Sequence, residues 1–145
     1  MRRSMLSLTL ALLAAASLAP LHASAQSAAA PTPYRVVVQV SDADPARWNL
    51  ALNNVKNLQD DLGAGNVTIE IVAYGPGIGM LKFEAATSAR VSDALKAGVT
   101  VLACENTMRS QTLARADMHP GVSYVPAGVV AIIKRQRDGW AYLRP

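Results

Sequence analysis

Short apolar runs rich in β-branched residues alternate along the chain with segments of helical character. The run 35–40, Arg-Val-Val-Val-Gln-Val, lacks strict alternation of polar and apolar residues, which is typical of a strand covered on both faces. Comparable runs follow at 67–74, 99–103, 122–125 and 140–143. Strands separated by helices form β-α-β units, whose right-handed crossovers give a mainly parallel sheet. The pattern predicts an α/β fold: a three-layer α/β/α sandwich with a mainly parallel five-stranded sheet.

The intervening segments have the periodicity and the capping residues of helices. Residues 45–62 should form the first helix, with Asp44 as N-cap and Pro45 at the first helical position. An amide row at 49, 53 and 57 either faces another subunit or a cleft, or is simply solvated. The other helical segments are expected at 78–83, 87–97, 106–118 (with a second cap near Thr112) and 128–138. In the last, the residues expected on the packing side are Val129, Val130, Ile132 and Ile133.

The first 25 residues have the pattern of a secretory signal peptide. A basic start at 1–3 precedes an apolar run at 5–19, and Ala23-Ser24-Ala25 has the small-x-small form of a cleavage site. The apolar run is shorter than the ~20 residues of a spanning helix, so a cleaved leader is favoured over a retained membrane anchor. We therefore expect a periplasmic protein in three parts: signal peptide 1–25, flexible lead-in 26–33 and folded domain 34–145.

The charge of the chain argues against a nucleic-acid partner. The whole chain has 14 Lys and Arg against 10 Asp and Glu, a net charge of +4. Arg2 and Arg3 lie in the expected leader, so the mature chain would carry 12 basic residues and a net charge of +2. The one basic cluster, 134–137, lies near the end of an expected helix, where cations suit the helix dipole. We expect no nucleic-acid partner and, once the leader is removed, no membrane partner.

Cys104 is the only cysteine, and it lies where the buried run 99–103 meets a polar segment able to start a helix. In an open α/β sheet, ligands bind at this kind of strand–helix junction. A single cysteine excludes an internal disulfide and leaves an inert thiol, a reactive thiol or a bridge between chains. Since His22 lies in the leader and His119 in a turn, the mature chain has no cluster of nitrogen and sulfur ligands. Neither a metal nor a cofactor is expected.

Several neighbours of Cys104 affect its reactivity, because the thiolate is the nucleophile and an ordinary cysteine titrates near ~8.5. Asn106 or Thr107 can cap the next helix, whose dipole contributes only ~0.3–1 kcal/mol. Arg109 would add to this effect, and Glu105 would oppose it if its carboxylate faces the sulfur. From the residues alone, a reactive thiol and a small apolar residue that ends a buried strand are equally open.

A glycine-rich turn at 75–80, Gly-Pro-Gly-Ile-Gly-Met, follows the run 67–74. It lacks the third glycine of a dinucleotide fingerprint and the Lys-Ser or Lys-Thr pair of a nucleotide P-loop. Its small residues either let backbone N–H groups approach an anion or a neighbouring side chain, or simply form a tight turn with positive φ. The carboxyl ends of parallel strands lie at one edge, so this turn and Cys104 could share a crevice.

Several segments resemble the DsrE/DsrF-like family. They are 48–54 (Trp-Asn-Leu-Ala-Leu-Asn-Asn), the turn 75–79 and, most specifically, 103–108 (Ala-Cys-Glu-Asn-Thr-Met). The segments 125–129 and 139–142 resemble the exported, uncharacterised branch of that family. The resemblance covers nearly the whole mature chain.

The resemblance implies a parallel α/β/α sandwich that assembles as a homo-oligomer, a trimer or a hexamer. It also implies a cysteine that accepts sulfane sulfur as a persulfide and exchanges it with a donor or acceptor protein, and only Cys104 can take that role. The residues expected to support Cys104 are Gly75, Gly77, Glu105, Asn106, Thr107 and Arg109. Two alternatives stay open: a non-enzymatic oligomeric binding module with an inert buried cysteine, and a thiol redox sensor.

Overall fold

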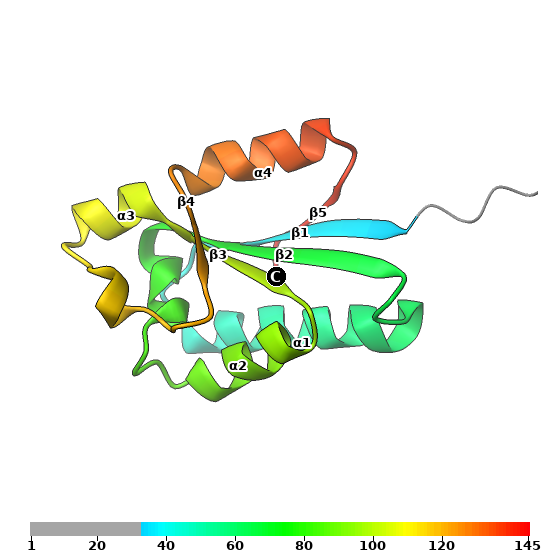
Figure 1. Ribbon diagram of the computed structural model, residues 1–145, viewed down its shortest axis with the longest axis horizontal. Helices are drawn as coiled ribbons and strands as arrows, with labels where there is room; N and C mark the ends of the chain where they lie inside the picture. Colours follow the sequence, from blue (N-terminus) through cyan, green and yellow to red (C-terminus); the bar gives the residue numbers. More distant parts are fainter. Residues whose placement is uncertain (1–32) are drawn as a thin grey trace, which may run out of the picture. The chain divides into compact units, whose positions relative to one another are not determined.

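Five parallel strands make up the central sheet of the computed structural model, which describes residues 33–145 (Figure 1). The strands are β1 (Tyr34–Val40), β2 (Val67–Ala73), β3 (Thr100–Cys104), β4 (Ser123–Val125) and β5 (Ala141–Leu143). They lie in the order β4-β3-β2-β1-β5, and every neighbouring pair is parallel. The predicted sandwich with a parallel five-stranded sheet is therefore confirmed. The expected signal peptide and most of the lead-in fall in residues 1–32, outside the described residues.

Helices cover both faces of this sheet. The described residues form α1 (Pro45–Leu62), α2 (Ser88–Lys96), α3 (Glu105–Ser110), α4 (Gly128–Arg137) and two 3₁₀ helices, η1 (Gly75–Leu81) and η2 (Arg115–Asp117). Helices α1 and α2 lie on one face of the sheet and α4 on the other (Figure 1). As predicted, α1 begins after Asp44, whose Oδ1 accepts a hydrogen bond from the Ala46 N–H at 2.8 Å. None of the helices within residues 33–145 has the length and apolar character needed to cross a membrane.

Two helical segments differ from the sequence-based expectation. The short helix expected at 78–83 is the 3₁₀ helix η1, which already begins at Gly75, directly after Tyr74. The segment 106–118 divides into α3 and η2, and α3 starts one residue earlier than expected, at Glu105. Thr112 lies between them with a φ of 55°, a left-handed conformation that interrupts a right-handed helix.

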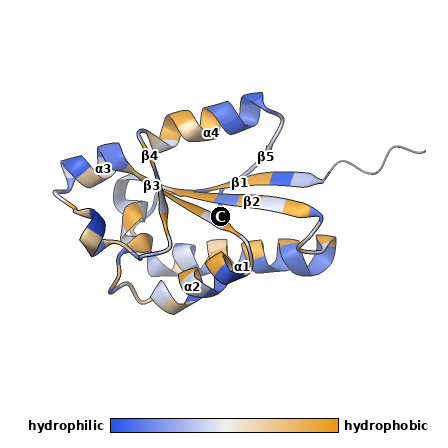
Figure 2. Ribbon diagram, in the orientation of Figure 1, coloured by the Kyte–Doolittle hydropathy of each residue, from blue (hydrophilic) through white to orange (hydrophobic). Residues whose placement is uncertain are grey.

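The two faces of the sheet bury cores of different size. The core against α1 and α2 contains 20 buried residues, whereas the core under α4 contains four: Val37, Val72, Leu102 and Ile132. Alternate side chains of a strand point to opposite faces, so β1 and β2 contribute to both cores. The strands are accordingly hydrophobic along most of their length (Figure 2). Since hydrophobic stabilisation scales with buried apolar area, most of it arises on the α1–α2 side.

Helix α4 buries less apolar surface than its sequence suggested. Of the four residues expected on its packing side, Ile132 is buried, but Val129, Val130 and Ile133 are 50%, 46% and 52% exposed. The stripe that faces the sheet includes Gly128, Ile132 and Arg135, which are spaced by four and three residues. Positions 129, 130 and 133 fall together on the opposite side of the helix, so the expectation was wrong for them.

A half-buried ion pair holds the second half of α4 on the sheet. Arg135 donates from Nε and Nη2 to the two carboxylate oxygens of Glu70, at 2.7 and 2.8 Å. The hydrogen bond with Glu70 raises the pKa of Arg135 above its ordinary value. The guanidinium also lies 5.0 Å from the ring centroid of Trp140. A bidentate pair of this kind fixes the orientation of the helix where the core beneath it is small.

The amide row of α1 is shared between two roles. Arg90 of α2 donates to Asn49 Oδ1 and to Asn53 Oδ1, both at 2.6 Å, and so links the two helices. Asn57, at the next position of the row, instead lines a groove on the surface of α1.

The glycine-rich turn packs against the end of β1. A Cβ added at Gly77 would lie 2.4 Å from the carbonyl oxygen of Val40, closer than van der Waals contact allows. The same carbonyl accepts a hydrogen bond from the Tyr74 N–H at 3.1 Å. Gly77 therefore permits backbone-to-backbone contact between the turn and β1.

We expect Gly77→Ala to lower the free energy of unfolding by about 1–3 kcal/mol, because the new methyl group overpacks against backbone that cannot rotate away. Gly65→Ala is the matched control, since no atom lies within 4 Å of a Cβ at that position. Urea unfolding followed by circular dichroism measures both variants. Equal unfolding midpoints for the two would contradict the close contact.

Candidate functional site

Cys104 is the last residue of β3 and lies beneath the first turn of α4. A Cβ added at Gly128 would meet Cys104 Cβ at 3.3 Å, and would also touch Tyr74 and Val72. Cys104 itself is only 4% exposed. The thiol is therefore enclosed between the sheet and α4.

The first residue of α4 donates a hydrogen bond directly to the sulfur. The Gly128 N–H lies 3.2 Å from Cys104 Sγ. This N–H belongs to the first turn of a helix, where backbone donors have no partner within the helix and carry the positive end of its dipole. The absence of a side chain at Gly128 lets the helix come this close to β3 and β2.

A second group of donors comes from α3. Cys104 occupies the N-cap position of this helix, so the N–H groups of Asn106 and Thr107 lie in its first turn. The Thr107 hydroxyl oxygen accepts a hydrogen bond from the Gly75 N–H at 2.9 Å, which leaves its own hydrogen free to point to the sulfur. The Asn106 N–H is shared, because it also donates to the carbonyl of Pro126 at 3.1 Å.

These donors outweigh the effect of burial on the thiol. Burial raises the pKa of Cys104, and the Thr107 hydroxyl is the strongest of the groups that lower it. The Gly128 N–H follows, and the N–H groups of Thr107 and Asn106 contribute in turn. The net result is a pKa below the ordinary value of a thiol. Hydrogen bonds to the charged form have this effect because they stabilise the thiolate.

The turn at 75–79 acts on the sulfur through one intermediate. Gly75, whose φ is 53°, directs its N–H to Thr107, and its carbonyl accepts from Gln111 Nε2 at 3.1 Å. Gly77 lies against β1, and its N–H donates to the carbonyl of Tyr74. The turn therefore orients the Thr107 hydroxyl, and these N–H groups do not themselves reach the sulfur.

The charged residues of α3 are engaged away from the thiol. Glu105 accepts from Arg115 at 2.9 Å, and Arg115 in turn stacks over the ring of Tyr124. Arg109 donates to the side chain of Asn106. The carboxylate of Glu105 and the guanidinium of Arg109 thus have partners of their own.

Gly128 is the site residue that the sequence did not reveal. Its position at the start of a helix was evident, but its contact with Cys104 joins residues 24 positions apart. Thr107 was expected as a helix cap, whereas the helix begins at Glu105 and Thr107 acts as a hydroxyl donor. A glycine within the first turn of a helix, despite its poor helix propensity, was the available signal.

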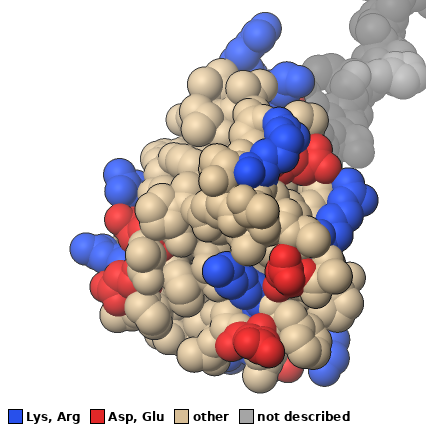
Figure 3. Space-filling model, turned by 90° about the vertical axis from the view of Figure 1, so that its left-hand side faces the viewer, with Lys and Arg blue, Asp and Glu red and all other residues tan. Residues whose placement is uncertain are grey.

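The surroundings of the site carry charges of both signs. Figure 3 shows the end of the molecule where α3 lies, with basic and acidic side chains scattered over a mostly uncharged surface. Within residues 33–145, no three His, Cys, Asp or Glu side chains come close enough together to hold a metal ion. The chemistry this arrangement offers is stabilisation of a sulfur anion by neutral donors.

We expect Thr107→Val to shift the pH profile of Cys104 alkylation to higher pH. The variant keeps the shape of the side chain but removes the hydroxyl that lowers the pKa most, so less thiolate forms at a given pH. Thr107→Ser retains a hydroxyl and should keep the wild-type profile. Rates of iodoacetamide labelling of the folded protein, taken from pH 5 upward, measure the three profiles. Coincident profiles for Thr107→Val and wild type would contradict the role of the hydroxyl.

No protein-family model and no curated protein matches the chain, but solved structures do. The protein of unknown function MTH1491 from Methanobacterium thermoautotrophicum is 41% identical, with a TM-score of 0.74; the match covers 77% of this chain and 99% of MTH1491.

Two further structures share the fold at low identity. BT1422, a conserved protein of unknown function from Bacteroides thetaiotaomicron, is 13% identical with a TM-score of 0.63, over 77% of this chain and 94% of that one. The ychN protein from E. coli is 10% identical with a TM-score of 0.61, over 78% of this chain and 99% of that one. At 41% identity over almost all of MTH1491, the relationship extends beyond fold, and all three neighbours have the DsrE/YchN-like fold. This chain therefore belongs, with MTH1491, to the DsrE/YchN-like fold family.

Proposed function

We propose that this protein accepts sulfane sulfur on Cys104 and carries it as a persulfide. The observation on which the proposal depends is the set of neutral donors around the sulfur: the Gly128 N–H lies at 3.2 Å, and the Thr107 hydroxyl is the strongest of the groups that lower the pKa of the thiol. Such donors stabilise both a thiolate and the negative sulfur of a persulfide. Membership of the DsrE/YchN-like fold family is compatible with sulfur-related chemistry.

The proposed step is a displacement at sulfur. The Cys104 thiolate attacks the outer sulfur of a donor persulfide, a bond forms between Sγ and that sulfur, and the sulfur–sulfur bond of the donor breaks. The electron pair of the broken bond leaves with the donor as its thiolate. The products are a Cys104 persulfide and a donor thiolate, so no separate oxidant or reductant is needed.

Incubation with a polysulfide or with thiosulfate should add the mass of one sulfur atom to the wild-type protein. The reason is that the lowered pKa leaves more of Cys104 as the attacking thiolate. Intact mass spectrometry before and after reduction measures the addition, which dithiothreitol should reverse. Cys104→Ser is the control and should gain nothing. A wild-type protein whose mass stays unchanged with both donors would overturn the proposal.

The burial of Cys104 favours a second candidate, an oligomeric binding module whose cysteine is inert. At 4% exposure, the thiol must be uncovered before a donor can reach it. An inert thiol would be alkylated slowly in the native protein and quickly only on unfolding. Under the sulfur-handling proposal, the native protein is instead alkylated without unfolding, at a rate that rises with the thiolate fraction.

We infer further that the protein is exported to the periplasm. We also infer that it assembles as a homo-oligomer, either a trimer or a hexamer. This assembly would exchange sulfur with a donor or acceptor protein. Support for export comes from the basic start, apolar run and Ala23-Ser24-Ala25 pattern of the leader. Support for assembly comes from the exposed apolar side of α4.

Cleavage after Ala25 should leave a mature protein that begins at Gln26. Bacterial signal peptidases need small side chains at this position, so Ala25→Phe should accumulate as the uncleaved chain. Intact mass and fractionation of the expressing cells measure both forms. A full-length wild-type mass in the membrane fraction would show a retained anchor instead.

A further inference from the structure

The outer side of α4 combines an apolar patch with a basic one. Val129, Val130 and Ile133 lie within about one turn of the helix and are each close to half exposed; we call them the α4 face. Single exposed apolar residues are ordinary, but a contiguous group of β-branched ones is typical of an interaction site. Lys134 and Arg137 follow on the exposed surface of the helix, and among the described residues neither forms an ion pair.

A groove lined by apolar side chains and one carboxylate lies beside α1. It has a volume of about 410 Å³ and lies where the second half of α1 meets the end of β5; we call it the α1–β5 groove. Leu58, Leu62 and Leu143 supply its apolar lining, and Asp61 and Asn57 its polar rim. Asp61 is exposed and, within residues 33–145, makes no ion pair.

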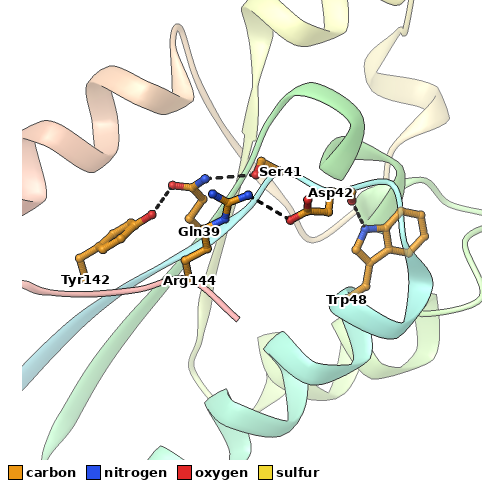
Figure 4. A network of polar contacts seen from close by, with 6 residues as sticks. All are labelled: Gln39, Ser41, Asp42, Trp48, Tyr142 and Arg144. Atoms are coloured by element: carbon orange, nitrogen blue, oxygen red, sulfur yellow. Dashed lines mark hydrogen bonds and ion pairs between the residues drawn. The ribbon is translucent and has the colours of Figure 1, made fainter.

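The two residues that flank Leu143 in the sequence, Tyr142 and Arg144, belong to a network of polar contacts at the end of the sheet (Figure 4). On one side of Leu143, the Tyr142 hydroxyl donates to Gln39 at 2.5 Å. On the other side, Arg144 pairs with Asp42 at 3.6 Å. The residue before Leu143 is hydrogen-bonded to β1, and the residue after it is ion-paired to the loop that follows β1. The wall of the groove that contains Leu143 is therefore formed before any partner binds.

We propose that the α4 face of one copy of this chain docks into the α1–β5 groove of a second copy. The two surfaces match in character: branched apolar side chains meet a leucine-lined groove, and Lys134 and Arg137 meet the unpaired carboxylate of Asp61. Because face and groove are different surfaces, the contact is head-to-tail and closes into a ring when its rotation permits.

This proposal deepens the homo-oligomer proposed above by naming its surfaces, and it places the second copy on the outer side of the helix turn that covers the thiol. Val129 and Val130 directly follow Gly128, whose N–H donates to Cys104 Sγ. A second copy seated on the α4 face therefore contacts the helix turn whose N–H donates to the sulfur. The geometry of assembly and that of the sulfur site are linked through a single helix turn.

Light scattering coupled to size exclusion tests the α4 face with mature-length protein that has retained its circular dichroism spectrum. Wild type should be oligomeric at micromolar concentration, and Ile133→Asp should be monomeric. Phe83→Asp is the matched control, because Phe83 is also exposed and belongs to neither surface. A monomeric wild type, or an Ile133→Asp that stays oligomeric, would overturn the proposal.

The groove is tested with surface substitutions that leave the core intact. The pair Asn57→Arg and Asp61→Arg should abolish assembly by repelling the basic residues of α4. Mixed with Ile133→Asp, this variant should form a one-to-one dimer, since each chain then contributes one intact surface. If the Asn57→Arg, Asp61→Arg variant assembles as the wild type does, the α1–β5 groove is not the docking site and the proposal is overturned.

A charge-reversal cycle tests the pairing of Arg137 with Asp61. Arg137→Glu and Asp61→Arg should each weaken assembly by about two- to fivefold. The variant that carries both Arg137→Glu and Asp61→Arg should recover the loss. Additive losses in the double variant would contradict the pairing. Sulfur uptake by monomeric Ile133→Asp, read by intact mass, is a separate result, so the failure of the sulfur proposal and that of the interface are distinguishable.

Discussion

The contact between the start of α4 and the end of β3 is the constraint on which the site depends. Gly128 brings a backbone N–H to 3.2 Å from Cys104 Sγ, and a side chain at that position would meet the sheet at three points. The same close approach covers the thiol and stabilises its charged form. This contact therefore contributes both to the burial of Cys104 and to its lowered pKa, and the Thr107 hydroxyl of α3 adds the largest lowering effect.

The uneven cover of the sheet places this site near a surface. On the α1–α2 side the helices pack on a large core, whereas α4 rests on a small one. The ion pair between Arg135 and Glu70 orients the far half of α4, and the N–H contact to Cys104 fixes its beginning. Between these two anchors the outer side of α4 stays apolar and exposed. The proposed second chain would therefore dock on the outer side of the same helix that covers the thiol.

The structure also changes how the glycine-rich turn contributes. Its first N–H is directed to the Thr107 hydroxyl, so the turn influences the sulfur through the orientation of a side chain. The rest of the turn packs against β1, where Gly77 allows backbone contact. The fold that carries this arrangement is shared with MTH1491 at 41% identity and with the ychN protein at 10%, so the topology tolerates wide change in sequence. The chemistry of a site depends on fewer residues than the topology does.

The order of strands and helices, the parallel sheet, the Asp44 cap and the place of Cys104 at a strand end were all determined by the sequence itself. These features follow from periodicity and from local backbone preferences, which act over a few residues and can be read along the chain. The contacts of the site could not be read in this way, because Gly128 and Cys104 are 24 residues apart and Gly75 and Thr107 are 32 apart. Nor could the side of α4 that meets the sheet, since apolar residues occur on both of its sides. Only the tertiary structure decides such matters, because it sets how closely a helix approaches the sheet and which of its two apolar sides turns inward.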